Sequence, residues 1–230
     1  MKVVIENSTA EIVEKKSRFI ANVFYIESED EAEKRLNEIR KKYYDAKHNC
    51  FAYILGKGGE VLKSSDDGEP QGTAGHPMLD ILKGENLTNC IAIVTRYFGG
   101  TLLGTGGLVR AYSESLKKAL VECKYSYIYD AYEVSFSLDY DDYGRLESII
   151  QNINQNVVLG DIVDKSYKMI LPVDKVYEDK VRVRYLIDDK VFDRFKSDIE
   201  SITRGNVSLE KKDKKIYYID VDKRIKYIYE

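Results

Sequence analysis

The stretch CIAIVTRYFGGTLLGTGGLVRAYSESLKKALVEC, residues 90–123, changes its structural pattern twice. Its first part, as far as Phe98, is a nearly continuous apolar run, which is typical of a buried β-strand. From Gly107 onward, apolar residues recur at helical spacing and predict an amphipathic helix. The glycines between the two parts predict a loop. The stretch therefore predicts a buried strand that leads through a glycine-rich loop into a helix.

A strand that leads through glycines into a helix is the arrangement in which backbone N–H groups and the positive end of a helix can face an anion, so this loop predicts an anion site. Its spacing fits neither the P-loop nor the GxGxxG dinucleotide motif. We therefore expect a general oxyanion or phosphate site rather than a nucleotide-enzyme motif. The alternative is a tight packing turn with both flanking arginines in solvent. The candidate site residues are Arg96, Gly99, Gly100, Gly104, Gly106, Gly107 and Arg110.

The residues before this stretch also alternate strands and helices. Residues 28–46 predict a helix that begins at Ser28 and carries acids in its first turn. A Gly-Lys-Gly-Gly sequence between two strand-like segments predicts a hairpin. The other expected elements are one or two strands over 11–26, the hairpin strands 48–55 and 60–65, and a short helix over 75–84.

The second half of the chain reads as strand, helix, two strands, helix and strand. This order predicts a ferredoxin-like antiparallel sheet with two helices on one face. We therefore expect an α+β protein with two domains, residues 1–127 and 128–230. The expected elements are strand 131–140, helix 141–155, strands 157–170 and 179–189, helix 191–205 and strand 216–222.

Another glycine segment, SSDDGEPQGTAGHPML at residues 64–79, combines acids, glycines and prolines. Because it comes earlier in the chain, we call it the first glycine segment, and we call the glycine-rich loop with its flanking Arg96 and Arg110 the second glycine segment. Asp66, Asp67 and Glu69 are candidate ligands of a hard cation, since carboxylates suit magnesium or calcium. They lack the spacing of an EF-hand loop, and a solvated turn with a helix cap is the alternative. The glycines near the expected helix start also suit an anion. The candidate anion-binding residues here are Gly72, Thr73, Gly75 and His76.

Two smaller groups are further candidates. His48 and Cys50 alternate on an expected strand and point to one face, as a nucleophilic pair would need. A buried strand histidine without a catalytic role is the alternative. Lys15, Lys16 and Arg18 form a short basic segment that suits phosphate contacts. Lysines that protect a strand edge explain the same segment equally well.

Composition limits the class of protein. The formal net charge is −3, which excludes a globally basic nucleic-acid protein, so any polyanion site must be local. Cys50, Cys90 and Cys123 are odd in number and far apart, which indicates free thiols in a reducing compartment. Neither a membrane span nor the apolar segment of a signal peptide is present in the 230 residues. We therefore expect a cytoplasmic protein with no membrane partner.

Four segments, KKSRFIA, DAKHNCFAY, SSDDGEPQGTAGHPML and RYFGGTLLGTGGLVRAY, follow one another between residues 15 and 120. In this order and spacing they closely resemble the IMPACT family, in its bacterial YigZ-like form. The resemblance implies a first domain with the β-α sandwich of ribosomal proteins, which also occurs in elongation factor G. It implies a second domain similar to a carboxy-terminal domain of that factor.

The resemblance also implies a role connected with translation. Eukaryotic members carry a different amino-terminal domain and bind the activator of a stress-responsive kinase of translation initiation. The 230 residues lack that domain, so we do not expect kinase regulation. For bacterial members, the fold implies binding to nucleic acid or the ribosome. A peptidase activity is sometimes attributed to the family. The sequence does not support it, because it contains no HExxH motif, no nucleophile elbow and no two-histidine metal set.

We therefore expect a non-catalytic protein that binds RNA, the ribosome or other translation machinery, without a cofactor or metal. The alternative is a small-molecule enzyme whose glycine loop holds a phosphorylated or carboxylated substrate while His48 or Asp66 moves a proton. The sequence presents no complete set of base and nucleophile, which favours binding. A protein partner on the sheet of the second domain is a third option.

Overall fold

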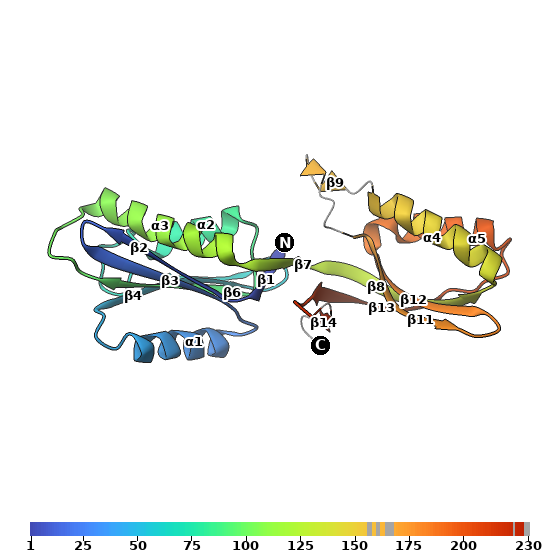
Figure 1. Cartoon of the computed structure of the whole chain (residues 1–230), viewed down its shortest axis with the longest axis horizontal. Helices are drawn as coiled ribbons and strands as arrows, with labels where there is room; N and C mark the ends of the chain where they lie inside the picture. The colour runs from blue at the N-terminus through green and yellow to red at the C-terminus, as the bar shows by residue number, and fades with distance from the viewer. Residues whose placement is uncertain (156–157, 160–161, 164–167, 223, 228–230) are drawn as a thin grey trace. The chain divides into compact units, whose positions relative to one another are not determined.

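The structure is a computed structural model, and it describes residues 1–155, 158–159, 162–163, 168–222 and 224–227. The chain divides into two compact units, Met1–Tyr127 with Ile219–Arg224, and Ile128–Tyr218 with Ile225–Glu230. Each unit combines helices with a five-stranded sheet (Figure 1). The two-domain α+β architecture expected from the sequence is therefore confirmed.

The sheet of the first unit has the strand order β2-β3-β6-β4-β5, and every neighbouring pair is antiparallel. Its strands are β2 (Ser8–Glu14), β3 (Ser17–Tyr25), β4 (His48–Leu55), β5 (Val61–Ser65) and β6 (Cys90–Tyr97). The strand β6 is central and buried over seven of its eight residues, as its apolar run predicts. Two short strands, β1 (Lys2–Glu6) and β7 (Lys124–Tyr127), pair with each other in a separate ribbon.

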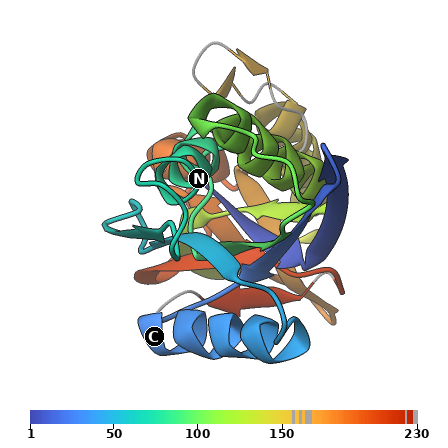
Figure 2. The ribbon, with the colours of Figure 1, turned by 90° about the vertical axis from the view of Figure 1, so that its left-hand side faces the viewer.

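Three helices cover the two faces of this sheet: α1 (Glu29–Lys42), α2 (Gly75–Gly84) and α3 (Thr105–Glu122). Figures 1 and 2 show α1 on one face and α2 with α3 on the other. Alternate residues of β6 point to opposite faces, so Ala92 and Val94 join the core under α2 and α3, while Ile91 and Ile93 join the core under α1. The sheet is therefore buried on both faces.

The helix α1 begins where the sequence predicts. Ser28 is its N-cap, and the Ser28 hydroxyl accepts a hydrogen bond from the N–H of Glu31 at 3.2 Å. Three acids lie in the first turn and three basic residues in the last, which complements the helix dipole. The expected helix over residues 28–46 is confirmed and ends at Lys42.

The sheet of the second unit has the strand order β11-β12-β8-β13-β14. The helices α4 and α5 pack on one face of it around a single apolar core. A short hairpin of β9 (Val158–Leu159) and β10 (Ile162–Val163) follows α4. The remaining elements are β8 (Tyr129–Leu138), α4 (Tyr140–Gln155), β11 (Ile170–Tyr177), β12 (Val181–Asp188), the 3-10 turn η1 (Asp189–Val191), α5 (Phe192–Ile202), β13 (Glu210–Ile219) and β14 (Ile225–Tyr227).

Two strand positions expected in this unit are wrong. The strand that pairs with β12 begins at Ile170 and not at residue 157, and residues 157, 160–161 and 164–167 of the expected strand lie outside the described part of the chain. Pro172 and an adjacent register shift break the alternation of β11, which an edge strand tolerates. The last long strand begins at Glu210 rather than at residue 216. Its first six residues are exposed and charged, so they lack the apolar alternation by which a strand is predicted.

Candidate functional site

Four connections of the first unit lie at the same end of its sheet, which we call the loop end. Arg18 pairs with Tyr97, and His48 pairs with Arg96, so the starts of β3 and β4 lie beside the end of β6. The sheet thus gathers segments that are far apart in the sequence, including both glycine segments. The connections at the loop end are residues 15–16, 43–47, 66–74 and 98–104.

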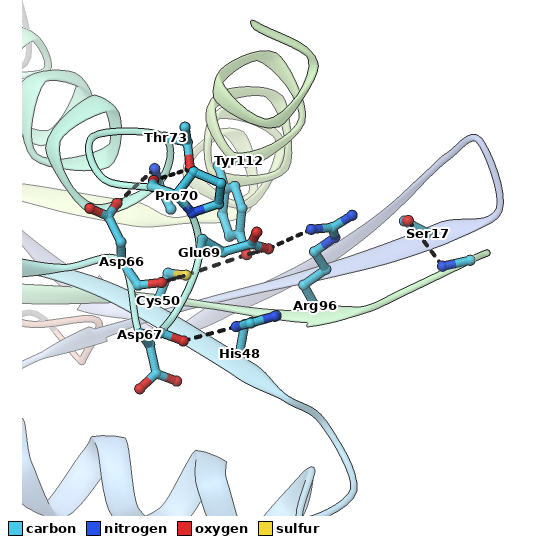
Figure 3. A network of polar contacts seen from close by, with 12 residues as sticks. Ser17, His48, Cys50, Asp66, Asp67, Glu69, Pro70, Thr73, Arg96 and Tyr112 are labelled. Carbon is cyan, nitrogen blue, oxygen red and sulfur yellow. Dashed lines mark hydrogen bonds and ion pairs between the residues drawn. The ribbon is translucent and has the colours of Figure 1, made fainter. Parts of the chain in front are cut away.

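The first glycine segment is organised around the carboxylate of Asp66 (Figure 3). Its oxygens accept hydrogen bonds from the backbone N–H groups of Gly72 at 2.8 Å, Ala74 at 2.9 Å and Gly75 at 2.8 Å. Burial raises the pKa of Asp66, but the three amide hydrogen bonds outweigh burial and hold this pKa below its usual value. The N–H groups at the start of α2 therefore already bind an anion that belongs to the protein.

Asp67 fastens the same segment to two other elements. Its backbone oxygen lies 2.9 Å from Nδ1 of His48, and since a carbonyl oxygen only accepts, Nδ1 carries the hydrogen. One carboxylate oxygen of Asp67 accepts from the backbone N–H of Asn49 at 2.7 Å, and the other from Arg40 of α1 at 3.2 Å. His48 is thus part of the support of this turn.

A buried ion pair joins the two glycine segments. Oε1 of Glu69 accepts hydrogen bonds from Arg96 at 2.6 Å and from the hydroxyl of Tyr112 at 2.8 Å (Figure 3). The side chains of Arg96 and Glu69 are only 7% and 4% exposed. The alternative interpretation, with both loop arginines in solvent, is therefore wrong for Arg96. Its charge stabilises the contact between the segments, because buried charges require a partner.

Cys50 lies beneath this network. Like Cys90 and Cys123, it is buried and forms no disulfide. Its sulfur lies 2.9 Å from the backbone oxygen of Asp66 and 3.3 Å from the hydroxyl of Tyr112. Burial raises the pKa of the Cys50 thiol to about 12. A thiol with that pKa stays protonated at neutral pH, whereas a nucleophilic pair needs a thiolate.

The second glycine segment packs against the turn between β2 and β3. A side chain at Gly99 would place its Cβ 2.0 Å from the carbonyl carbon of Lys16, so this approach requires glycine. The N–H of Gly99 donates to the hydroxyl of Ser17 at 3.1 Å. Lys15 and Lys16 form a two-residue turn with φ of 44° and 68°, and both are exposed. The loop and the two lysines therefore form one surface.

The start of α3 lies next to this surface. Its N-cap is Gly104, with φ of 72°, and no side chain in the described part of the chain caps its first N–H groups. Arg110 is exposed and donates through Nε to the backbone oxygen of Gly106 at 3.2 Å. A hollow of about 280 Å³ separates the helix from the turn. Residues that line it include Lys15, Leu103, Gly107 and Arg110, together with the acids Glu14 and Glu114.

Three other candidates lie apart from this hollow or point elsewhere. Arg18 forms a bidentate pair with Glu11, at 2.9 and 3.0 Å. It lies over the ring of Tyr97, on the face of the sheet opposite to α3 and the hollow. Thr73 is buried, and its hydroxyl donates to a backbone oxygen at 2.6 Å. His76 is exposed in the first turn of α2. Among the described residues, no cluster of three or more His, Cys, Asp or Glu side chains is arranged to hold a metal ion.

The sequence interpretation missed Tyr112, which connects Glu69 with the buried thiol. Its signal was present, because Leu108, Ala111, Tyr112 and Ser115 follow the spacing of one buried helical face. The ring of Tyr112 is fully buried, and only its hydroxyl needs a hydrogen-bond partner.

Comparisons with known proteins place this unit among related sequences. The family model of the Impact N-terminal domain matches residues 15–120. The IMPACT family member YvyE of Bacillus subtilis is 49% identical over 110 residues, which cover 48% of this chain and 51% of that protein. The IMPACT family member YigZ of Escherichia coli is 34% identical over 172 residues, which cover 71% of this chain and 82% of that protein. The match thus spans about half of the first relative and most of the second.

One solved structure is similar over nearly the whole chain. It is the crystal structure of a hypothetical protein, with 28% sequence identity and a TM-score of 0.53, and the match covers 90% of this chain and 95% of that one. Within the described residues, no helix is both long and apolar enough to cross a membrane.

Proposed function

Because the chain belongs to the IMPACT family, we propose that it takes part in the regulation of translation by binding RNA or the ribosome at the loop end. The family expected from the sequence is confirmed by the relative that is 34% identical and covered over 82% of its length. The role in translation is what the family resemblance implies. A cytoplasmic location belongs to the same proposal, since the three cysteines are free thiols, as a reducing compartment favours.

The second unit supports the proposed link with translation. Its main elements follow in the order β8, α4, β11, β12, α5 and β13, with the short strands β9 and β10 between α4 and β11, the turn η1 before α5, and β14 after β13. The strand order over the main strands is β11-β12-β8-β13, with all described pairs antiparallel. This order is the one expected of a ferredoxin-like split β-α-β fold. We therefore propose a ferredoxin-like second domain, similar to the domain of elongation factor G named by the resemblance.

One observation carries the proposed binding surface. Lys15 and Lys16 are exposed and held in a fixed turn by Gly99, beside the uncapped start of α3 and the exposed Arg110. Two side-chain cations, Lys15 and Arg110, line one hollow of about 280 Å³ together with Gly107 of the first turn of α3, and Lys16 adds a third exposed cation next to Lys15. Phosphate groups bind such donors readily, and RNA presents phosphates in a row. Glu14 and Glu114 also line this hollow, and their negative charges repel phosphate, so the proposed phosphate contacts lie on the side of the hollow that the cations line.

The internal contacts narrow the set of residues that contact RNA in this proposal. Asp66 occupies the N–H groups of the α2 segment, and Glu69 occupies Arg96. The first glycine segment therefore supports the loop end and does not supply the phosphate site. The contacts are assigned to Lys15, Lys16, Arg110 and the first N–H groups of α3.

Fluorescence anisotropy of a labelled single-stranded RNA and a labelled structured RNA, at low and moderate salt, tests this proposal with the variant Lys15→Asn/Lys16→Gly. Asn-Gly favours the same two-residue turn, so the fold is kept while two charges are removed. We expect binding to weaken, and the slope of log affinity against log salt for the single strand to fall by about 1.4, because two phosphate contacts are lost.

The matched control is Lys34→Gln/Lys41→Gln, which removes two exposed charges from α1 on the opposite face of the sheet. We expect this control to keep most of the affinity and the salt slope. Equal losses in both variants would indicate a general charge effect. No binding of either RNA by the parent protein would contradict the proposal.

A further inference from the structure

Phe98 is the large apolar side chain at the beginning of the second glycine segment, and 56% of it is exposed. Its ring is not isolated, because the guanidinium carbon of Arg96 lies 5.7 Å from its centroid. The same carbon lies 5.4 Å from the centroid of the buried Phe19 ring. Arg96 thus links a ring in the core with a ring at the surface.

The backbone holds Phe98 in place. Tyr97, the preceding residue, is the last residue of β6 and pairs with Arg18 of β3. Gly99, the following residue, packs its Cα against the backbone of Lys16. The backbone of Phe98 is therefore held in place next to the exposed lysine turn, while its ring stays open to solvent. Such rings serve as stacking platforms in proteins that bind single strands, because every base has a π-face.

A second observation, independent of the exposure of the ring, concerns the arginine beside it. Arg96 is 6% exposed, and its Nη1 is bonded to Glu69. Its guanidinium is therefore held 5.7 Å from the Phe98 centroid, within the range of a cation–π contact. This buried cation supports the ring and leaves its exposed part open to a ligand.

We propose that Phe98, supported by the neighbouring guanidinium of Arg96, stacks on an unpaired base of single-stranded RNA. This inference rests on the proposed function and specifies its ligand. Single-stranded RNA fits best because a duplex covers the faces of its bases, whereas a single strand exposes them. Lys15 and Lys16, next to Gly99, supply the positive charge that the adjoining phosphates require.

The chain contains no tryptophan, so Phe98→Trp introduces a single fluorescent reporter at this position. The probes are a single-stranded RNA of about 12 nucleotides, the duplex of the same RNA, and heparin, a polyanion without bases. We expect the single strand to quench the tryptophan by about half or more, and the duplex and heparin to quench it little. The control is Leu102→Trp, at a residue of the same loop that is 83% exposed, where quenching should be weak.

Affinity supplies a second readout that does not depend on the reporter. Phe98→Leu keeps an apolar side chain and removes the π-face, and we expect it to weaken binding of the single strand roughly 10-fold, while Phe98→Tyr keeps the affinity of the parent. Thermal unfolding of both variants should resemble that of the parent, because the ring is exposed.

The outcomes separate this inference from the function on which it rests. Suppose that the parent binds RNA and that Lys15→Asn/Lys16→Gly binds it more weakly. Suppose also that RNA does not quench the tryptophan of Phe98→Trp and that Phe98→Leu binds RNA as the parent does. The stacking inference is then overturned and the proposed function stands. If the parent binds no RNA at all, both fail. Equal quenching at positions 98 and 102, or quenching by a ribosomal protein but not by RNA, would also overturn the inference.

Discussion

The starts of α2 and α3 are both preceded by a glycine segment, but a side chain binds the N–H groups of α2 and none in the described part of the chain binds those of α3. Both helices follow glycine segments, and both begin at the loop end. The N–H groups at the start of α2 are filled by the carboxylate of Asp66, while Gly104 offers no cap to α3. A glycine segment before a helix therefore indicates that an anion can bind there, but not whether the protein supplies its own.

Composition explains the difference. Asp66 lies six to nine residues before the N–H groups that it binds, and a turn that includes Gly68 and Gly72, both with positive φ, returns the chain to it. The residues between β6 and α3, FGGTLLG, contain no acid and no amide side chain. The start of α3 is thus left for an external anion. A helix start that the protein fills stabilises the fold, and one that it leaves open is available for binding.

The largest expected effect concerns the ion pair that joins the two segments. Glu69→Gln leaves the buried Arg96 without a counter-charge, and we expect a loss of about 3–5 kcal/mol in the free energy of unfolding, measured with urea. Adding Arg96→Met should restore part of this loss, since the charge is removed with its partner. This result would establish that the first glycine segment has a structural role.

The control for that experiment is Glu11→Gln, which removes the partner of Arg18 in an exposed pair. We expect little change in the urea midpoint, because water screens exposed pairs. A similar loss in Glu69→Gln and Glu11→Gln would show that burial of the Arg96 pair adds nothing.

A smaller effect is expected at the filled helix start. Asp66→Asn keeps one acceptor oxygen but loses the charge and turns an NH₂ group towards a backbone N–H, so we expect a loss of about 1–2 kcal/mol at neutral pH. The pKa of Asp66 is lowered in the folded protein. Its stabilisation is therefore complete above the unfolded pKa of about 3.9 and is lost as the pH falls through the lower folded value.

Unfolding of parent and Asp66→Asn from pH 7 down to pH 3 measures this dependence. The difference between the two proteins should stay constant to about pH 4 and then shrink. A difference that is independent of pH would mean that the charge of Asp66 plays no part in binding the three N–H groups.

The features that the sequence predicted well depend on neighbours in the chain. Ser28 caps α1 through a bond to a residue three positions away, and the apolar run of β6 shows its burial directly. Both signals are local, so propensity and periodicity suffice. The position of the edge strand β11 was predicted wrongly for a local reason as well, because Pro172 and a register shift interrupt the alternation that marks a strand.

The contacts of the candidate site could not be read from the sequence in the same way. Glu69 and Arg96 are 27 positions apart, and Glu69 and Tyr112 are 43 positions apart. Periodicity assigns Arg96 and Tyr112 to faces of their elements, but Glu69 lies in a loop. The pairing of His48 with Arg96 and the bond between His48 and Asp67 bring that loop next to Arg96. Candidate residues of the right chemical type were therefore identified, while their division into internal support and open surface required the structure.

The last and smallest effect on stability comes from making the two helix starts alike. Thr105→Asp places a carboxylate in the exposed first turn of α3, where it complements the helix dipole, so we expect a gain of about 0.3–1 kcal/mol in stability. The same carboxylate occupies the place proposed for phosphate, so RNA affinity should fall severalfold. Thr105→Asn is the neutral control, and anisotropy with urea unfolding measures both quantities. Increased stability with unchanged RNA affinity would remove the start of α3 from the binding surface and leave the lysine turn and Arg110 as its only proposed cationic contacts.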